Sequence, residues 1–190
     1  ALTTADLAVF TGSQIRAFTL EQVSLLSTNQ IEGMQRGQFS SLTSEQLTAL
    51  STAQISAIQV FDMGGFSAMQ INALSTDQVQ AITTTNVAVM SATQVAALTT
   101  DQVSALTTSQ VKALNTADVA ALSSGQVQAL TTAQVNVLST TNVAAMTTTQ
   151  VAALSTAQVQ ALTAGEVTAL STSQVQAMST AQVNALSTAQ

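Results

Sequence analysis

The sequence predicts an all-α fold: a solenoid or superhelix of very short helices, with one helix in each eight-residue repeat. Three observations lead to this prediction. Apolar residues recur at every eighth position without insertion or deletion, each repeat carries a helix-start signal, and the period of eight does not suit one continuous helix. A β-solenoid is the alternative, and the many Val and Thr residues favour it.

The repeat has two apolar positions and one amide position. The first apolar position runs from Leu7 to Val183, which makes 23 residues spaced eight apart. The second follows three residues later, from Phe10 to Leu186. Gln stands directly before the first apolar position, and we call this the Gln position. Its replacements are Asp6, Asp62, Asn86, Asp118, Asn142 and Glu166.

Each repeat contains its own helix start. Ser or Thr follows the second apolar position in 20 of 23 repeats, and the Gln position lies three residues further on. This is a capping box, in which the hydroxyl accepts from the amide three residues later and Gln reaches back to the cap amide. Eight residues advance about 800° around a helix, so an apolar stripe drifts roughly 80° per repeat. The chain is therefore predicted to break at each Ser or Thr.

The β-solenoid alternative is less consistent with the pattern. The apolar positions do not alternate as they do in a strand, the chain has no Pro, and its 7 Gly are few for the corners of a β-coil. A single repeat buries too little apolar surface to fold alone. Stability is therefore expected from the stacking of neighbouring repeats.

The domain prediction is one octapeptide array over residues 1–190, with a more degenerate part at 1–70 and a near-regular part at 71–190. Asp6, Asp62 and Asp118 mark a weaker period of 56 residues. One interpretation is a structural superperiod of seven repeats, and the other, which we adopt, is a block duplication. The chain starts with ALTTADL and stops with ALSTAQ, inside a repeat. We expect it to be a stretch of a longer array, with any targeting segment outside it.

The composition excludes several classes of function. Three basic residues, Arg16, Arg36 and Lys112, cannot form a phosphate-binding surface, so no nucleic-acid partner is expected. The chain has no Cys, which excludes disulfides and thiolate metal sites. No apolar run reaches the roughly 18 residues that span a bilayer, so no membrane span is expected. Only 6% of the residues are charged, and we expect an uncharged surface of Ser, Thr and Gln.

Catalysis has few candidate groups, because the chain also lacks His. The carboxylates of Asp77 and Asp101, or of Asp118 and Glu166, are pairs whose spacing allows them to converge. The other interpretation is that they are surface residues or variants of the helix cap, and we adopt it. We therefore predict no enzyme and no catalytic, cofactor-binding or metal-binding residue.

The phrases LSTAQVQAL at residues 154–162 and LTTDQVSAL at residues 98–106 resemble the tandem octapeptides of long surface or secreted proteins of Gram-negative bacteria. The resemblance covers the whole chain. It implies an extracellular or cell-surface location and a role in a filament, a matrix or an adhesin stalk.

We predict a structural protein that associates with itself, with the cell surface or a glycan as a further partner. The alternative is a binding module that recognises glycan or ice through a Ser/Thr/Gln face, since Thr recurs at regular intervals from Thr76 onward.

Overall fold

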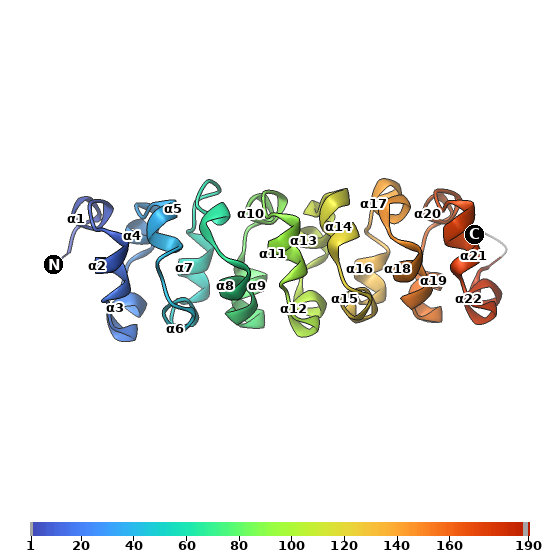
Figure 1. The fold of residues 1–190 in the computed structure, drawn as a ribbon, viewed down its shortest axis with the longest axis horizontal. Helices are drawn as coiled ribbons and strands as arrows, with labels where there is room; N and C mark the ends of the chain where they lie inside the picture. The colour runs from blue at the N-terminus through green and yellow to red at the C-terminus, as the bar shows by residue number, and fades with distance from the viewer. Residues whose placement is uncertain (1, 188–189) are drawn as a thin grey trace. The chain divides into compact units, whose positions relative to one another are not determined.

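The computed structural model describes residues 2–187 and residue 190. These residues form 22 α-helices of four to six residues and one 3-10 helix, and they contain no strand (Figure 1). The prediction of an all-α fold with one short helix per repeat is confirmed, and the β-solenoid alternative is wrong.

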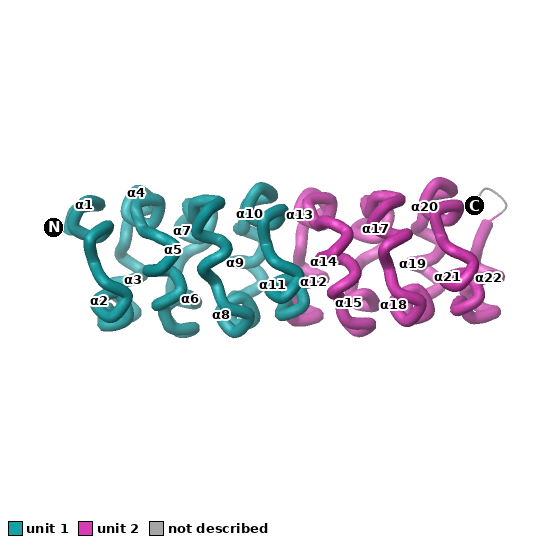
Figure 2. Tube along the Cα trace, turned by 45° about the horizontal axis from the view of Figure 1, so that its top comes forward, with its two compact units in different colours: residues 1–98 teal, residues 99–190 magenta. Residues whose placement is uncertain are grey.

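The chain divides into two compact units, residues 1–98 and residues 99–190 (Figure 2). The helices of the first unit are α1 (Thr4–Ala8), α2 (Gly12–Arg16), α3 (Leu20–Ser24), α4 (Thr28–Glu32), α5 (Arg36–Phe39), α6 (Ser44–Thr48), α7 (Thr52–Ser56), the 3-10 helix η1 (Met63–Gly65), α8 (Ala68–Ala73), α9 (Thr76–Ala81), α10 (Thr84–Ala88) and α11 (Ala92–Ala96). Those of the second unit are α12 (Thr100–Ala105), α13 (Thr108–Ala113), α14 (Thr116–Ala121), α15 (Ser124–Ala129), α16 (Thr132–Val135), α17 (Thr140–Ala145), α18 (Thr148–Ala153), α19 (Thr156–Ala161), α20 (Ala164–Thr168), α21 (Thr172–Ala177) and α22 (Thr180–Ala185).

Helix α13 shows how one repeat folds. Thr107 has extended backbone angles, φ −69° and ψ 156°, and its hydroxyl accepts from the Gln110 amide at 3.2 Å. The Gln110 side chain accepts in return from the Thr107 amide at 2.8 Å, which completes the predicted capping box. Leu114 is again extended and ends the helix. Six helical residues and two extended residues therefore fill the period of eight.

The two apolar positions of the repeat form the core. From Leu7 to Val159, every residue at the first apolar position is at most 2% exposed. From Leu26 to Leu162, every residue at the second position is at most 9% exposed. Both side chains of each repeat therefore point inward, and each unit is a solenoid whose axis is lined by Val, Leu, Ile, Met and Phe.

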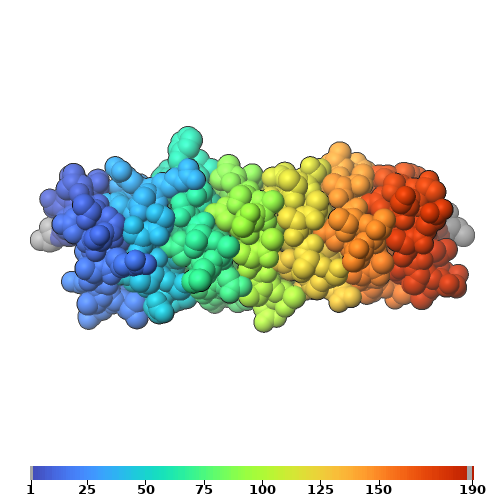
Figure 3. Space-filling view, in the orientation of Figure 1, coloured from blue at the N-terminus to red at the C-terminus, as the bar shows by residue number. Residues whose placement is uncertain are grey.

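One turn of the solenoid contains about 28 residues. In the second unit, α15 packs against α12 and α18, each three helices away. The Gln134 side chain bonds to backbone carbonyls 28 and 31 residues earlier, and that of Asn136 to one 25 residues later. In Figure 3 the colours of each unit follow one another in bands. Within a unit, each turn therefore lies beside the turns that come before and after it in the sequence.

This turn length explains the weaker period of 56 residues. A turn of about 28 residues is three and a half repeats of eight, so the same point of a repeat returns to the same side of the solenoid after two turns. The turn length thus fits the structural superperiod of seven repeats, the interpretation that we set aside for a block duplication.

One repeat of the first unit departs from the pattern. In residues 59–66, Gln59 replaces the cap Ser or Thr, and the short 3-10 helix η1 replaces the α-helix. Asp62, in the Gln position, makes no side-chain cap bond there. Arg36 of α5 donates from Nη2 to the Gly64 carbonyl at 2.7 Å and holds the segment in place. The adjacent Phe61 side chain is 86% exposed.

Candidate functional site

The residues at the Gln position join successive turns. We call the buried Gln residues of this set the glutamine ladder. Those whose bonds between turns lie inside one unit are Gln38, Gln46, Gln54, Gln70, Gln78, Gln94, Gln134, Gln150, Gln158, Gln174 and Gln182. Each of these side chains is at most 5% exposed. The Nε2 group of each donates to the backbone of the turn before, 28 and 31 residues back. Gln134, for example, donates to the Val103 carbonyl at 2.9 Å and to the Leu106 carbonyl at 2.6 Å.

The primary amide is the group that this position requires. Its oxygen accepts from the cap amide of its own helix, at 2.7 Å from Thr131 to Gln134, while its nitrogen donates to the carbonyls at the end of an earlier helix. The last carbonyls of a short helix have no partner within the helix and need one when they are buried. One side chain thus provides hydrogen bonds both to the N-terminus of its own helix and to the C-terminus of an earlier helix.

The expectation that Gln forms part of the exposed surface is wrong for the glutamine ladder. The capping role followed from a spacing of three residues. The donor role depends on a partner about 28 residues away, which no local pattern reveals. The signal that could have found it is the choice of Gln over Glu, since a cap alone accepts either residue.

Asn at the Gln position keeps only part of this arrangement. Asn86 donates from Nδ2 to the Ile58 carbonyl at 2.8 Å, and Asn142 donates to the Leu114 carbonyl at 3.1 Å. Neither helix has the full capping box. The Asn side chain is one methylene shorter than Gln and makes the bond between turns without reaching its own cap amide.

The acidic residues at the Gln position cap their helices but lack the amide donor. Asp118 accepts from the Asn115 amide at 3.0 Å, and Glu166 accepts from the Thr163 amide at 2.6 Å. They are 1% and 2% exposed, and each completes the capping box of its helix, which confirms the interpretation of both as variants of the helix cap. The exposed Asp6 also caps its helix, and bonds from Thr3 lower the pKa of its carboxyl.

The hydrogen bonding of the Asp118 carboxylate is incomplete. Its Oδ1 atom is buried without a hydrogen-bond partner among the described residues. Burial raises the pKa of Asp118, and the bond from Asn115 offsets this only in part. Burial also raises the pKa of Asp62, where the nearby Arg36 acts in the opposite direction.

The carboxylates of Asp118 and Glu166 in the second unit do not form a shared site, although their spacing in the sequence allowed one. Helix α17 packs against both α14, which carries Asp118, and α20, which carries Glu166. The two carboxylates therefore lie in different turns, each at its own cap. Asp77 lies on α9 and Asp101 on α12, and both side chains are exposed. Over residues 2–187 and 190, no three acidic, His or Cys residues gather as metal ligands would.

The outer surface of the second unit carries almost no charge. Between residues 99 and 190 the exposed charged side chains are Asp101 and Lys112. The rest of the exposed surface consists mainly of the cap Ser and Thr, of the Thr that follows each cap, and of Ala and Gln, as in Thr107, Thr108 and Gln128. This surface offers hydroxyl and amide groups at a spacing of eight residues.

A stack of short helices in which each turn contacts only its neighbours defines a helical solenoid of the repeat-protein class. The chain belongs to the ALTTAQ repeat family, which matches residues 1–36, 55–92, 80–108, 87–116, 111–148, 132–164, 143–172 and 164–190. The family's six letters stand unchanged at residues 129–134. No curated protein sequence matches the chain.

None of the helices in the described part of the chain is both long enough and apolar enough to cross a bilayer.

Proposed function

We propose that the chain is a structural, self-associating repeat protein of the cell surface or extracellular space, a component of a filament, a matrix or an adhesin stalk. The observation that carries the proposal is the uncharged outer surface of the second unit, with Asp101 and Lys112 as its exposed charges. Surfaces of one sign of charge keep proteins apart, and this surface lacks that repulsion. The resemblance to octapeptide regions of Gram-negative surface proteins supports the location.

The distribution of polar groups supports a structural rather than a catalytic role, and we propose that the chain is not an enzyme. The buried amides of the glutamine ladder are used by helix caps and by bonds between turns. The buried carboxylates of Asp118 and Glu166 lie at separate caps rather than beside one another. The polar groups that recur in each repeat therefore serve to build the solenoid, which supports a role that depends on a long, regular structure.

Electron microscopy and sedimentation velocity over a concentration series test this function. We expect filaments or strings of copies that lengthen as the protein concentration rises. Discrete particles of one mass at every concentration would overturn self-association.

The alternative of a binding module rests on the exposed Thr residues, such as Thr108, Thr132 and Thr156. Equivalent Thr residues are 24 or 32 residues apart, whereas a turn contains about 28, so they are staggered from turn to turn. A staggered array does not present the flat lattice that ice recognition needs. Glycan-array binding by discrete particles that do not assemble would favour this second function.

A further inference from the structure

Two hollows of the first unit, of about 320 and 190 Å³, share Arg16 and Ser40 in their linings. We call the two hollows together the Arg16 groove. It follows the places where α2 packs against α5 and where α6 packs against α8. The larger hollow is at the lower end of the roughly 300–1,000 Å³ that small-ligand sites occupy. The groove is thus large enough for one small ligand.

The position of Arg16 in its repeat directs its side chain into this groove. Asn72 holds the same place in a later repeat, directly after the first apolar position, and donates from Nδ2 to the Ala97 carbonyl, 25 residues later. The place 25 residues after Arg16 is residue 41, and Ser41 lines the groove together with Arg16. The groove therefore lies on the side of α2 that faces the following turn.

The Arg16 guanidinium has no ion pair and no hydrogen bond within the described part of the chain. Arg36, the other Arg, donates to the Gly64 carbonyl at 2.7 Å. Glu45 lines the groove, but bonds from its own amide and from the Thr43 side chain lower the pKa of its carboxyl and hold it at the start of α6. Arg16 thus presents a free fork of N–H donors, the group that binds a carboxylate best.

The other groups of the groove are acceptors and an apolar surface. Ser40 and Ser41 donate from Oγ to the Gly37 carbonyl, at 2.9 and 2.8 Å, so their hydroxyl oxygens are left to accept. The Met69 side chain, also in the lining, is 75% exposed. A sugar ring has hydroxyl donors and an apolar C–H face that match these groups. A compact anion such as sulfate has no donor for these oxygens and is repelled by Glu45.

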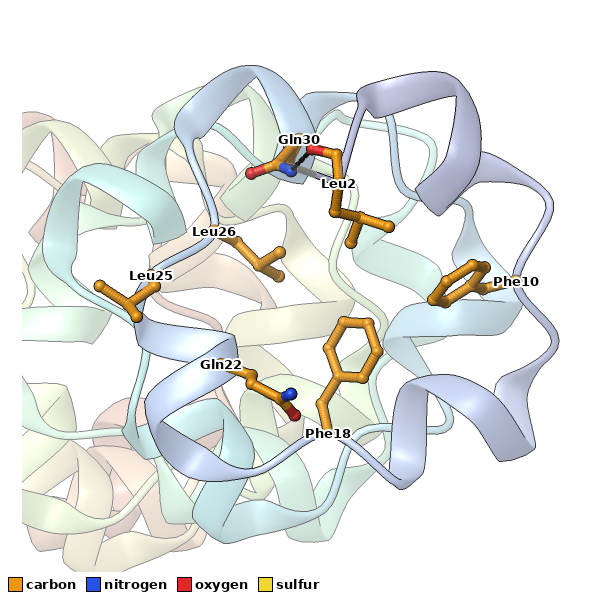
Figure 4. A pocket seen from close by; sticks show the side chains of 7 residues that line it. All are labelled: Leu2, Phe10, Phe18, Gln22, Leu25, Leu26 and Gln30. Atoms are coloured by element: carbon orange, nitrogen blue, oxygen red, sulfur yellow. Dashed lines mark hydrogen bonds between the residues drawn. The ribbon is translucent and has the colours of Figure 1, made fainter.

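The apolar hollow at residues 2–30 lacks such groups. Figure 4 shows Phe10, Phe18 and Leu26 around it, and its described lining contains no charged side chain. This hollow lies where the sequence begins inside a repeat, so its exposure is not evidence of a binding site.

We propose that the Arg16 groove binds a sugar carboxylate, such as a uronic acid residue of a glycan. Arg16 pairs with the carboxylate, Ser40 and Ser41 accept from ring hydroxyls, and Met69 lies against the ring. The site is separate from the exposed Thr residues of the second unit. It does not rest on self-association, so a chain that assembles but binds no sugar carboxylate would lose this site and keep the proposed function.

NMR titration of the unaltered chain with glucuronate tests the site, because the chain has two Arg residues and therefore two Arg Nε–H signals. At about pH 6, where carboxylates are ionised, the Arg16 signal should shift and saturate while the Arg36 signal stays in place. Arg16→Gln, followed through the backbone amides of residues 40–45, should weaken binding by about tenfold or more, because a hydrogen bond between charged groups is lost. Lys112→Gln is the matched control, since it removes one positive charge from the second unit, and it should bind as the unaltered chain does.

Ser40→Leu separates a shaped groove from a lone charge. The substitution fills both hollows and keeps Arg16, so binding should be lost while circular dichroism shows an unchanged fold. Glucuronate binding that neither Ser40→Leu nor Arg16→Gln weakens would overturn the proposal.

Three other probes define the ligand class. Glucose lacks the carboxylate, acetate lacks the ring, and N-acetylalanine has the carboxylate of a peptide terminus. Each should bind at least about tenfold more weakly than glucuronate, because each loses part of the hydrogen bonding. Acetate that binds as well as glucuronate would show adventitious ion pairing only, and glucose that binds as well would remove the role of Arg16. Tighter binding of N-acetylalanine would make the ligand a peptide, and each of these three results would overturn the proposal.

Discussion

The substitution Gln134→Ala tests the glutamine ladder at a position where all of the bonds are known. Oε1 accepts from the Thr131 amide at 2.7 Å, and Nε2 donates to the Val103 and Leu106 carbonyls at 2.9 and 2.6 Å. The Val103 carbonyl keeps a second bond, from the Leu106 amide. Nε2 also makes a longer bond, at 3.3 Å, to the carbonyl of Ser104, an exposed residue. The substitution therefore leaves three groups without this partner, and the two that should cost most are the Thr131 amide and the Leu106 carbonyl. At about 1–3 kcal/mol for each, the free energy of unfolding should fall by about 2–6 kcal/mol.

Urea unfolding followed by far-UV circular dichroism measures this loss. Gln128→Ala is the matched control, because Gln128 is exposed in the same unit, and it should change the free energy by less than about 0.5 kcal/mol. Gln134→Glu separates the donor from the acceptor: the new carboxyl still accepts from Thr131 but cannot donate when ionised. Its loss of stability should be large at pH 7 and smaller at pH 4, where the protonated acid donates. If Gln134→Ala and Gln128→Ala unfold alike, the argument that the ladder joins the turns is refuted.

Three further substitutions test other parts of the account by the same unfolding measurement. Asp118→Gln should raise the free energy of unfolding by about 1–3 kcal/mol at pH 7, because it replaces a buried oxygen that has no partner with a donor. Since burial raises the pKa of Asp118 in the fold, its contribution is fully present below the ordinary value of 3.8 and is lost as the pH rises through the folded value. The gain from Asp118→Gln should thus grow with pH over this window, and a gain independent of pH would contradict the assignment. Thr107→Ala removes the bond to the Gln110 amide and should cost about 1 kcal/mol, whereas Thr108→Ala beside it, with no cap role, should cost clearly less. Gly65→Ala should destabilise the first unit, because the added Cβ would lie 2.6 Å from the Arg36 carbonyl oxygen, while Gly37→Ala meets no atom within 4 Å; equal costs would show that the segment yields freely.

The parts of the fold that depend on near neighbours could be predicted from the sequence. The cap at Thr107 and the partner at Gln110 are three residues apart, and the same spacing recurs along the chain. The apolar residues of the core, such as Val111 and Leu114, follow from the same register. Helix starts, helix length and the inward face of each repeat are therefore local properties of eight residues.

The parts that depend on the turn of the solenoid could not be predicted. The number of repeats per turn follows from how α15 fits against α12 and α18, and no single repeat contains that information. The burial of the Gln position and the free oxygen of Asp118 are consequences of that fit. The 3-10 helix at residues 63–65 was missed for a different reason: Gln59 and Asp62 depart from the cap pattern, but their effect on the backbone depends on contacts with Arg36.

The most direct test of the buried glutamine ladder is the hydrogen exchange of glutamine side-chain amides, measured by NMR on protein labelled with ¹⁵N-glutamine. Gln134, Gln150 and Gln158 are 2% exposed and bonded between turns, so their Nε2 protons should exchange only when the solenoid opens. The exposed Gln128, Gln160 and Gln176 should exchange at the rate of a free amide. Two separate classes of exchange rate would support the account, and one fast class for all glutamines would contradict it.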